Sequence, residues 1–332
     1  NTPPNKDIRW EKTTTVNVGV DFALFRHRLS GTIEYYNKYS VDLLAAINGS
    51  PTQGFGYTTL MTNNGKMVNR GVEITLSGEI IRQKDFSWNA SLLYAFNRNK
   101  VKHISVQPSL WDSRISMPTS YPMVGKPLYG IYAYKWAGLN ENGDPQVYDA
   151  ENNVTSGPAR DYHALVYCGT TVPIHNASLT NVLRYKGFEF SAMLILDVGH
   201  KLRSSNIPSI NMSNGRITST AKGIVDRWTQ PGDVTDVPRL LFSNDTENFN
   251  THRTELYRYS DLFVYDASNI RLSNISLAYR VPAHWCKKIS LSGARLQFNV
   301  ENVATFAFDS KANYDLGGKV KPNYVWGLYL NF

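Results

Sequence analysis

The chain has 332 residues, of which 42% are hydrophobic, a formal net charge of +8 and a mean hydropathy of -0.34. No run of ~18 apolar residues occurs, which excludes a membrane-spanning helix. The basic residues are scattered and aromatic RNA-binding signatures are absent, so nucleic acid is not expected as a partner. The two cysteines, Cys168 and Cys286, form no CxxC pair and indicate neither a zinc site nor a disulfide framework.

The first hundred residues predict four β-strands, because apolar and polar residues alternate there with a period of two. The clearest strand carries Trp88, Leu92 and Tyr94 on one face and serines and asparagines on the other. Its large aromatics lie near its two ends, which is typical of a lipid-facing strand. A sandwich strand with its apolar face inward is the alternative. The four strands are predicted at about residues 13–25, 29–39, 66–81 and 86–97, with a Gly- and Thr-rich loop at about 42–65.

Five further strands are predicted in the rest of the chain, where long polar connections separate them in alternation with short turns. The longest connections cover about residues 101–175, 199–261 and 304–322. The five strands are predicted at about residues 177–185, 188–198, 263–281, 294–300 and 324–332.

The connections alternate between short basic turns, such as residues 26–28 and 186–187, and loops of some tens of residues. Outer-membrane barrels have short periplasmic turns and long external loops, whereas a soluble sandwich has no reason to segregate them. The second face of each strand is polar, which favours a wide barrel with a wet lumen. The predicted fold class is therefore all-β, an antiparallel transmembrane β-barrel in contact with outer-membrane lipid.

Seven segments, in this order and nearly end to end, resemble the C-terminal half of the SusC/RagA-like TonB-dependent outer-membrane transporters of Bacteroidetes. The segments are residues 10–22, 64–74, 125–132, 136–139, 143–145, 269–277 and 299–302. The resemblance implies that residues 1–332 are about nine C-terminal strands of a barrel of about 22 strands. It also implies that the plug domain and the first strands belong to an N-terminal part absent from this chain.

The same resemblance implies TonB-dependent active import of glycan fragments or oligopeptides across the cell outer membrane. The implied partners are a SusD-like surface lipoprotein, the remaining N-terminal part of the transporter and, through that part, TonB. It further implies that Phe332 is the terminal aromatic read by the barrel-assembly machinery. A structural or adhesive outer-membrane barrel that moves nothing is the alternative function.

The lack of recognisable catalytic motifs in the sequence predicts that the chain is not an enzyme. The seven histidines are dispersed, and no GxSxG elbow, P-loop or GxGxxG occurs. Residues 140–144, from Asn140 to Asp144 around Gly143, are faintly similar to a calcium loop. A tight Asn-Gly turn explains this segment more simply, so no cofactor is expected.

Aromatic residues in the long connections are the candidate substrate-binding residues, since their rings could stack on sugars or peptide groups at the mouth of a barrel. The alternative is that they pack loops onto one another or onto a lipoprotein lid. These candidates are Trp111, Tyr129, Tyr132, Trp136 and Trp228.

Three structural expectations follow from the barrel interpretation. Apolar side chains on the lipid-facing side should be exposed in the isolated chain, and Cys168 and Cys286 should lie at opposite ends of the strands, unlinked. The start of the chain should lie at the long-loop end and Phe332 at the short-turn end. The apolar side chains in question are Trp88, Leu92, Tyr94, Phe190, Leu194 and Leu328.

Overall fold

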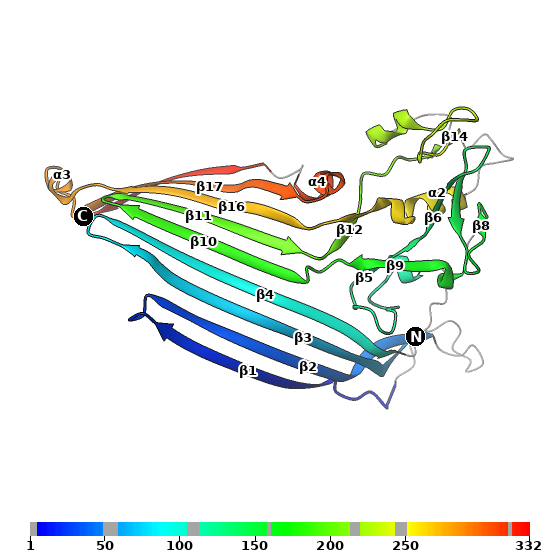
Figure 1. Cartoon of the computed structure of the whole chain (residues 1–332), viewed down its shortest axis with the longest axis horizontal. Helices are drawn as coiled ribbons and strands as arrows, with labels where there is room; N and C mark the ends of the chain where they lie inside the picture. The colour runs from blue at the N-terminus through cyan, green and yellow to red at the C-terminus, as the bar shows by residue number, and fades with distance from the viewer. Residues whose placement is uncertain are drawn as a thin grey trace.

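The computed structural model describes residues 5–48, 59–104, 113–157, 161–212, 220–242, 251–317 and 321–332. Its dominant feature is one nine-stranded antiparallel sheet in which each strand pairs with the next one along the chain among the nine, and β1 and β18 form the two edges (Figure 1). The predicted barrel wall of nine antiparallel strands is therefore confirmed. In sheet order the strands are β1 (Lys12–Leu24), β2 (Leu29–Asn48), β3 (Thr59–Arg82), β4 (Phe86–Ile104), β10 (His175–Tyr185), β11 (Phe188–Val198), β16 (Asn269–Arg280), β17 (Gly293–Ala307) and β18 (Asn323–Asn331).

The pairing register places apolar residues on one face of the sheet and polar residues on the other. Leu76, Leu92, Leu179 and Leu194 lie side by side across β3, β4, β10 and β11. Successive side chains of a strand point to opposite faces, so the neighbouring polar positions share the second face. We call the face that carries the leucine row the outer face and the polar face the inner face.

The outer face stays open to its surroundings, as a lipid-facing surface does. None of the six apolar side chains expected there is buried. Phe190 and Leu328 are exposed, and the other four are half-buried between their neighbours in the sheet. This layout excludes the closed sandwich as the structure of these strands.

Four strands extend further toward the long connections than predicted. The predicted loops at residues 42–65 and 304–322 are therefore wrong where these strands continue, and β17 reaches Ala307. β2 continues to Asn48, β3 already begins at Thr59, and β4 continues to Ile104. Register shifts interrupt the β2–β3 pairing between Ser40 and Leu43 and again before Leu44. A bulge adds an unpaired residue and breaks the period of two, so the sequence pattern stops while the strand continues.

The two ends of the sheet differ, as predicted. Figure 1 shows the short hairpin turns, α3 (Ala283–Lys287) and the C-terminus together at one end, and the long connections at the other. At the latter end the side chain of Asn5 donates to Met61 O at 2.8 Å, and Arg9 N donates to Asn63 Oδ1 at 2.7 Å. The first described residues thus lie beside the long-loop end, whereas β18 finishes at the short-turn end.

The long connections are folded rather than open, and we call their described parts, within residues 113–174 and 199–268, the loop region. Its strands form a pair β5–β9, a triplet β6–β7–β8 and the pairs β12–β15 and β13–β14. The strands are β5 (Gly130–Tyr134), β6 (Trp136–Leu139), β7 (Pro145–Tyr148), β8 (Val154–Thr155), β9 (Leu165–Thr170), β12 (Lys201–Arg203), β13 (Asn211–Met212), β14 (Leu241–Phe242) and β15 (Val264–Asp266). The α-helices are α1 (Ser113–Ser116), α2 (Thr251–Arg258) and, between β17 and β18, α4 (Asn313–Leu316), with short 3-10 helices at Tyr162–Ala164, Lys222–Asp226, Asp261–Phe263 and Ser310–Ala312.

A small apolar core holds the loop region together. It consists of Tyr132, Tyr134, Val147, Ala164, Leu165 and Leu256. The predicted strand at residues 263–281 is corrected by this packing: Val264–Asp266 pairs with β12 in the loop region, and the barrel strand β16 begins only at Asn269.

The two cysteines lie at opposite ends of the sheet. Cys168 is in β9 of the loop region, Cys286 is in α3 at the short-turn end, and both are free thiols. The prediction that they are not linked is confirmed. In the part of the chain that the structure describes, no helix is long and apolar enough to span a membrane.

Candidate functional site

A cavity of about 530 Å³ in the loop region is the principal candidate for ligand binding. It lies between the segment that follows β12 and the C-terminal end of α2. Polar groups of several kinds converge on it: two guanidinium groups, hydroxyls, an amide and tyrosine rings. Its polar lining includes Arg203, Ser205, Asn211, Thr254, Arg258 and Tyr259. A concave site with a few convergent polar groups suits a polar oligomer.

Arg203 fixes one wall of this cavity by binding three backbone carbonyls. Its Nη1 donates to Arg258 O and Ser260 O, each at 3.3 Å, and its Nη2 donates to Tyr132 O at 2.6 Å. Burial lowers the pKa of this guanidinium, but from an ordinary value so high that the group stays charged. Arg203 therefore joins β12, β5 and the end of α2.

Asp144 joins the other segments of the loop region. Its carboxylate accepts hydrogen bonds from Arg239 Nε at 3.0 Å and Nη2 at 2.8 Å, and from Arg253 Nε at 2.7 Å. Arg253 is only 2% exposed and also donates to Asn211 Oδ1 at 2.6 Å. The bidentate contact with Arg239 is the strong geometry for a carboxylate, so Asp144 anchors α2 and the approach to β14 against the β6–β7 turn.

Residues 140–144 form a tight turn, as expected for the Asn-Gly segment. Asn140 Oδ1 accepts hydrogen bonds from Asn142 N at 3.0 Å and Asp144 N at 2.8 Å, and Gly143 has φ +73°. The Asp144 carboxylate is occupied by the two arginines. Within the described residues no group of three or more His, Cys, Asp or Glu side chains could hold a metal ion.

Three of the five aromatic candidates, Tyr132, Trp136 and Trp228, pack against other parts of the loop region. Tyr132 is 1% exposed, and its hydroxyl accepts a hydrogen bond from Met123 N at 3.1 Å while Arg114 covers its ring. Trp228 lies against Gly143, where an added Cβ would overlap its ring. Tyr132 therefore offers no free ring face for stacking in this structure, because its ring is packed in the apolar core of the loop region.

Of the described candidates, Tyr129 has the most open side chain. Tyr129 is 46% exposed. Trp136 is half-buried, contacts Tyr257 with ring centroids 5.9 Å apart, and its Nε1 donates to Asp236 Oδ1 at 2.9 Å. Trp111 lies outside the described residues. The cavity residues Arg258 and Tyr259 were missed by the sequence reasoning, although a basic residue between two tyrosines in a long connection was a usable signal.

At the opposite end of the sheet, Phe332 is 92% exposed, and Ser292 Oγ donates to its backbone carbonyl at 3.3 Å. Its side chain continues the outer-face series of β18. Its role as a barrel-assembly signal stays a prediction.

Comparison with known proteins decides what this sheet belongs to. The model of the family described as TonB dependent receptor-like, beta-barrel matches residues 1–303. The chain belongs to this family. It is an outer-membrane barrel family, which confirms the predicted localisation and the resemblance seen in the sequence.

Individual TonB-dependent receptors are similar over nearly the whole chain. TonB-dependent receptor P3 of Formosa agariphila is 26% identical over 98% of this chain and 33% of its own length. TonB-dependent receptor SusC of Bacteroides thetaiotaomicron is 25% identical over 90% of this chain and 29% of its own length. The solved structure described as the RagAB peptide transporter superposes with a TM-score of 0.76 at 23% identity, over all of this chain and 36% of that one.

Two consequences follow for this TonB-dependent receptor barrel. The family and these relatives are named as receptors and transporters, which confirms that the chain is not an enzyme. The chain spans about a third of the length of the relatives it matches. The likeness to the solved structure shows the fold alone.

Proposed function

We propose that this chain supplies part of the barrel wall and the external loops of a transporter that imports oligomeric nutrients across the outer membrane, using energy delivered through TonB. The observation that carries the proposal is the family match over residues 1–303, on a sheet with an apolar outer and a polar inner face. A wide barrel with a polar interior is suited to a passage for polar solutes.

The proposed cargo is either glycan fragments or oligopeptides. The cavity of the loop region supports either, since guanidinium and hydroxyl groups bind peptide carboxylates and sugar hydroxyls. The RagAB structure is described as that of a peptide transporter, which supports the peptide alternative.

A SusD-like surface lipoprotein is the proposed partner of the loop region, and TonB is reached through the N-terminal part of the transporter. Apolar side chains exposed on the loop region support a covering partner: Val225 is 66% exposed and Val234 is fully exposed. Affinity purification of the full-length transporter from native outer membranes should retain a lipoprotein in a fixed ratio.

The test of transport uses the full-length transporter in its native cells. Cells receive a defined mixture of isotope-labelled oligopeptides and a separate mixture of labelled oligosaccharides, and periplasmic label is measured. We expect one mixture to accumulate in the parent strain and not in strains that lack either the transporter or TonB. Equal accumulation in all three strains would favour the structural or adhesive barrel.

A further inference from the structure

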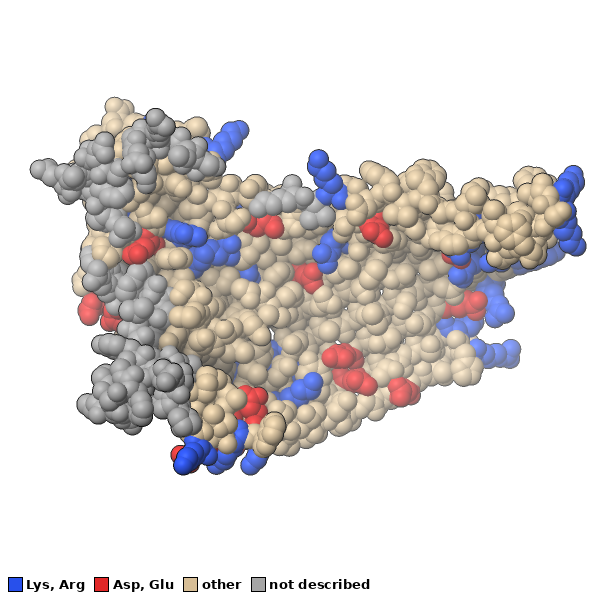
Figure 2. Space-filling view, turned by 180° about the vertical axis from the view of Figure 1, so that it is seen from behind, with Lys and Arg blue, Asp and Glu red and all other residues tan. Residues whose placement is uncertain are grey.

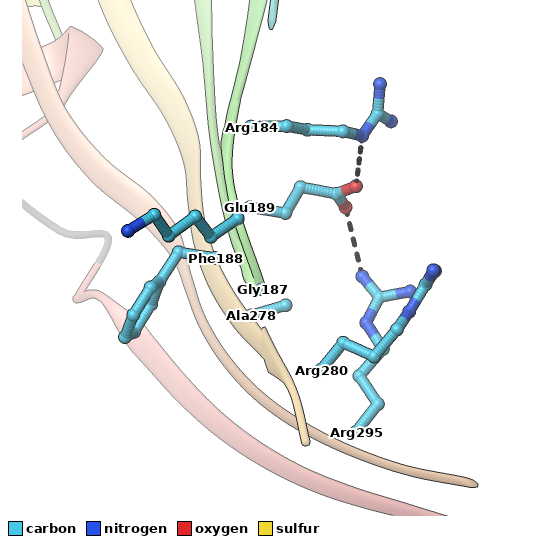
Figure 3. Close-up of a pocket in the computed structure, with 8 residues that line it drawn as sticks. Arg184, Gly187, Phe188, Glu189, Ala278, Arg280 and Arg295 are labelled. Atoms are coloured by element: carbon cyan, nitrogen blue, oxygen red, sulfur yellow. Dashed lines mark hydrogen bonds and ion pairs between the residues drawn. The ribbon is translucent and has the colours of Figure 1, made fainter. Parts of the chain in front are cut away.

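The inner face carries a cluster of arginines at the short-turn end of the sheet. They surround a hollow of about 130 Å³ whose lining includes Arg184, Glu189, Ala278, Arg280 and Arg295 (Figure 3). In Figure 3 the three arginines and Glu189 point to the same side, whereas Phe188 points away toward the outer face. We call these three arginines the arginine cluster.

The arginine cluster has more positive charge than its single carboxylate offsets. Glu189 accepts a hydrogen bond from Arg184 Nε at 2.7 Å and another from Arg295 Nη2 at 3.1 Å. Arg280 makes no ion pair within the described residues. It lies directly opposite Arg295 in the β16–β17 register, and like charges placed directly opposite each other destabilise a sheet.

The inner face also carries a cross-strand pair of like negative charges, on β2 and β3. Glu34 and Glu73 lie directly opposite each other in the β2–β3 register, and the described part of the chain gives neither an ion pair. Figure 2 shows a short row of acidic side chains over the lower strands and basic side chains gathered at the short-turn end. Two like-charge pairs of opposite sign on one face indicate a surface that a partner of complementary charge covers.

We propose that Arg280 and Arg295 together bind a side-chain carboxylate from the part of the transporter's own polypeptide that lies inside the barrel, beyond these 332 residues. Relatives are about three times as long as this chain, and barrels of about 22 strands have a plugged lumen. Paired guanidinium groups match the geometry of a carboxylate. Because the cluster faces inward, lipid head groups are the less suitable occupant.

The first test is zero-length cross-linking of the full-length transporter in isolated outer membranes. The variant Arg280→Lys keeps the positive charge and supplies a primary amine. A water-soluble carbodiimide activates a carboxylate in contact with it, and attack by the amine forms an amide while the urea leaves. We expect peptide mass spectrometry to find residue 280 linked to an Asp or Glu outside these 332 residues.

One control variant defines the result. Arg82→Lys places an amine at the same end of the sheet, where Arg82 already pairs with Glu79 at 3.5 Å, and should link to Glu79 alone. Links from residue 280 only to Glu189, or no link at all, would overturn the proposal.

The second test is charge reversal in the full-length transporter. Arg280→Glu should lower the temperature at which the folded barrel converts to the unfolded form on an electrophoretic gel. Reversing the cross-linked acid to Arg in the same chain should restore it, whereas Lys84→Glu, in an exposed turn at the same end, should leave it unchanged. Additive losses in the double variant would contradict the pairing. Neither test depends on cargo uptake, so failure here and failure of the transport proposal are distinguishable.

Discussion

At the scale of single residues, the loop region depends on a few polar contacts between segments distant in sequence. Asp144 and Arg253 are 109 positions apart, yet their side chains meet at 2.7 Å with Arg253 almost fully buried. Removing one partner of such a pair leaves an uncompensated buried charge. The apolar core of the loop region is small, so these contacts decide whether the segments stay together.

Asp144→Ala should destabilise the loop region by about 3–5 kcal/mol, because it removes the carboxylate that accepts hydrogen bonds from Arg239 and from the buried guanidinium of Arg253. Hydrogen–deuterium exchange of α2 in the full-length protein should accelerate. Asp149→Ala is the matched control: Asp149 accepts turn hydrogen bonds from Glu151 N and Asn153 N and pairs with no arginine among the described residues, so it should cost only about 1 kcal/mol. Equal effects of the two substitutions would argue against the Asp144 network.

Gly143→Ala should displace the Trp228 ring, because a Cβ at residue 143 overlaps it and φ is +73°. The expected result is a shift in tryptophan emission and a lower unfolding temperature of the loop region. Gly232→Ala separates the two causes, since Gly232 has φ +99° but nothing within 4 Å of an added Cβ. It should show only the backbone cost, about 1–2 kcal/mol. The interpretation of Trp228 as a packing residue is wrong if both variants behave alike.

At the scale of elements, the barrel strands were predictable where period two is unbroken and not where bulges interrupt it. The strand 188–198 was predicted with its observed bounds, since Phe188, Phe190 and Leu194 alternate with polar residues. The upper parts of β2 and β4 were missed, because bulges shift the register beyond Ser40 and Lys66. The small sheets of the loop region have two to six residues per strand, too few for a periodic pattern.

The sequence predicted that the candidate site lies in the long connections, but it did not predict which residues line the site. The sequence indicated aromatic residues in the long connections, but burial depends on the tertiary contacts that cover each ring. Tyr132 and Tyr129 are three positions apart on one segment, yet one is 1% and the other 46% exposed. Arg203 carries no local motif, and the Tyr257-Arg258-Tyr259 segment alone could not predict the cavity, since segments that meet only in the folded loop region form it.

Leu92→Arg should impair barrel assembly, because Leu92 lies in the leucine row of the outer face and a guanidinium there faces hydrocarbon. The expected cost is about 2–4 kcal/mol near the middle of the membrane. Leu93→Arg is the control of the same type on the same strand, since Leu93 lies on the inner face and is 51% exposed. Heat-modifiable mobility of the full-length protein on gels should show less folded barrel for Leu92→Arg alone. Equal losses would contradict the assignment of the two faces.

At the scale of the whole molecule, the sheet has two chemically different ends and two chemically different faces. The long-loop end carries a folded region with a polar cavity, and the short-turn end carries the arginine cluster and Phe332. In outer-membrane barrels the longer loops are extracellular and the short turns periplasmic. The central claim is therefore that the loop region faces the outside of the cell.

Native Cys168 is a poor reporter of this orientation, because burial raises the pKa of its thiol to about 11 and little thiolate is present at neutral pH. A better reporter is a cysteine placed at a fully exposed position of the loop region. Val234 suits this purpose, and Lys288 at the end of α3 is its counterpart at the short-turn end.

The most direct measurement of the central claim is labelling of intact cells with a membrane-impermeant maleimide. The full-length protein would carry Cys168→Ser and Cys286→Ser together with either Val234→Cys or Lys288→Cys. We predict that residue 234 is labelled in intact cells, and that residue 288 is labelled only after the outer membrane is permeabilised. Labelling of residue 288 in intact cells, with residue 234 protected until permeabilisation, would contradict the account.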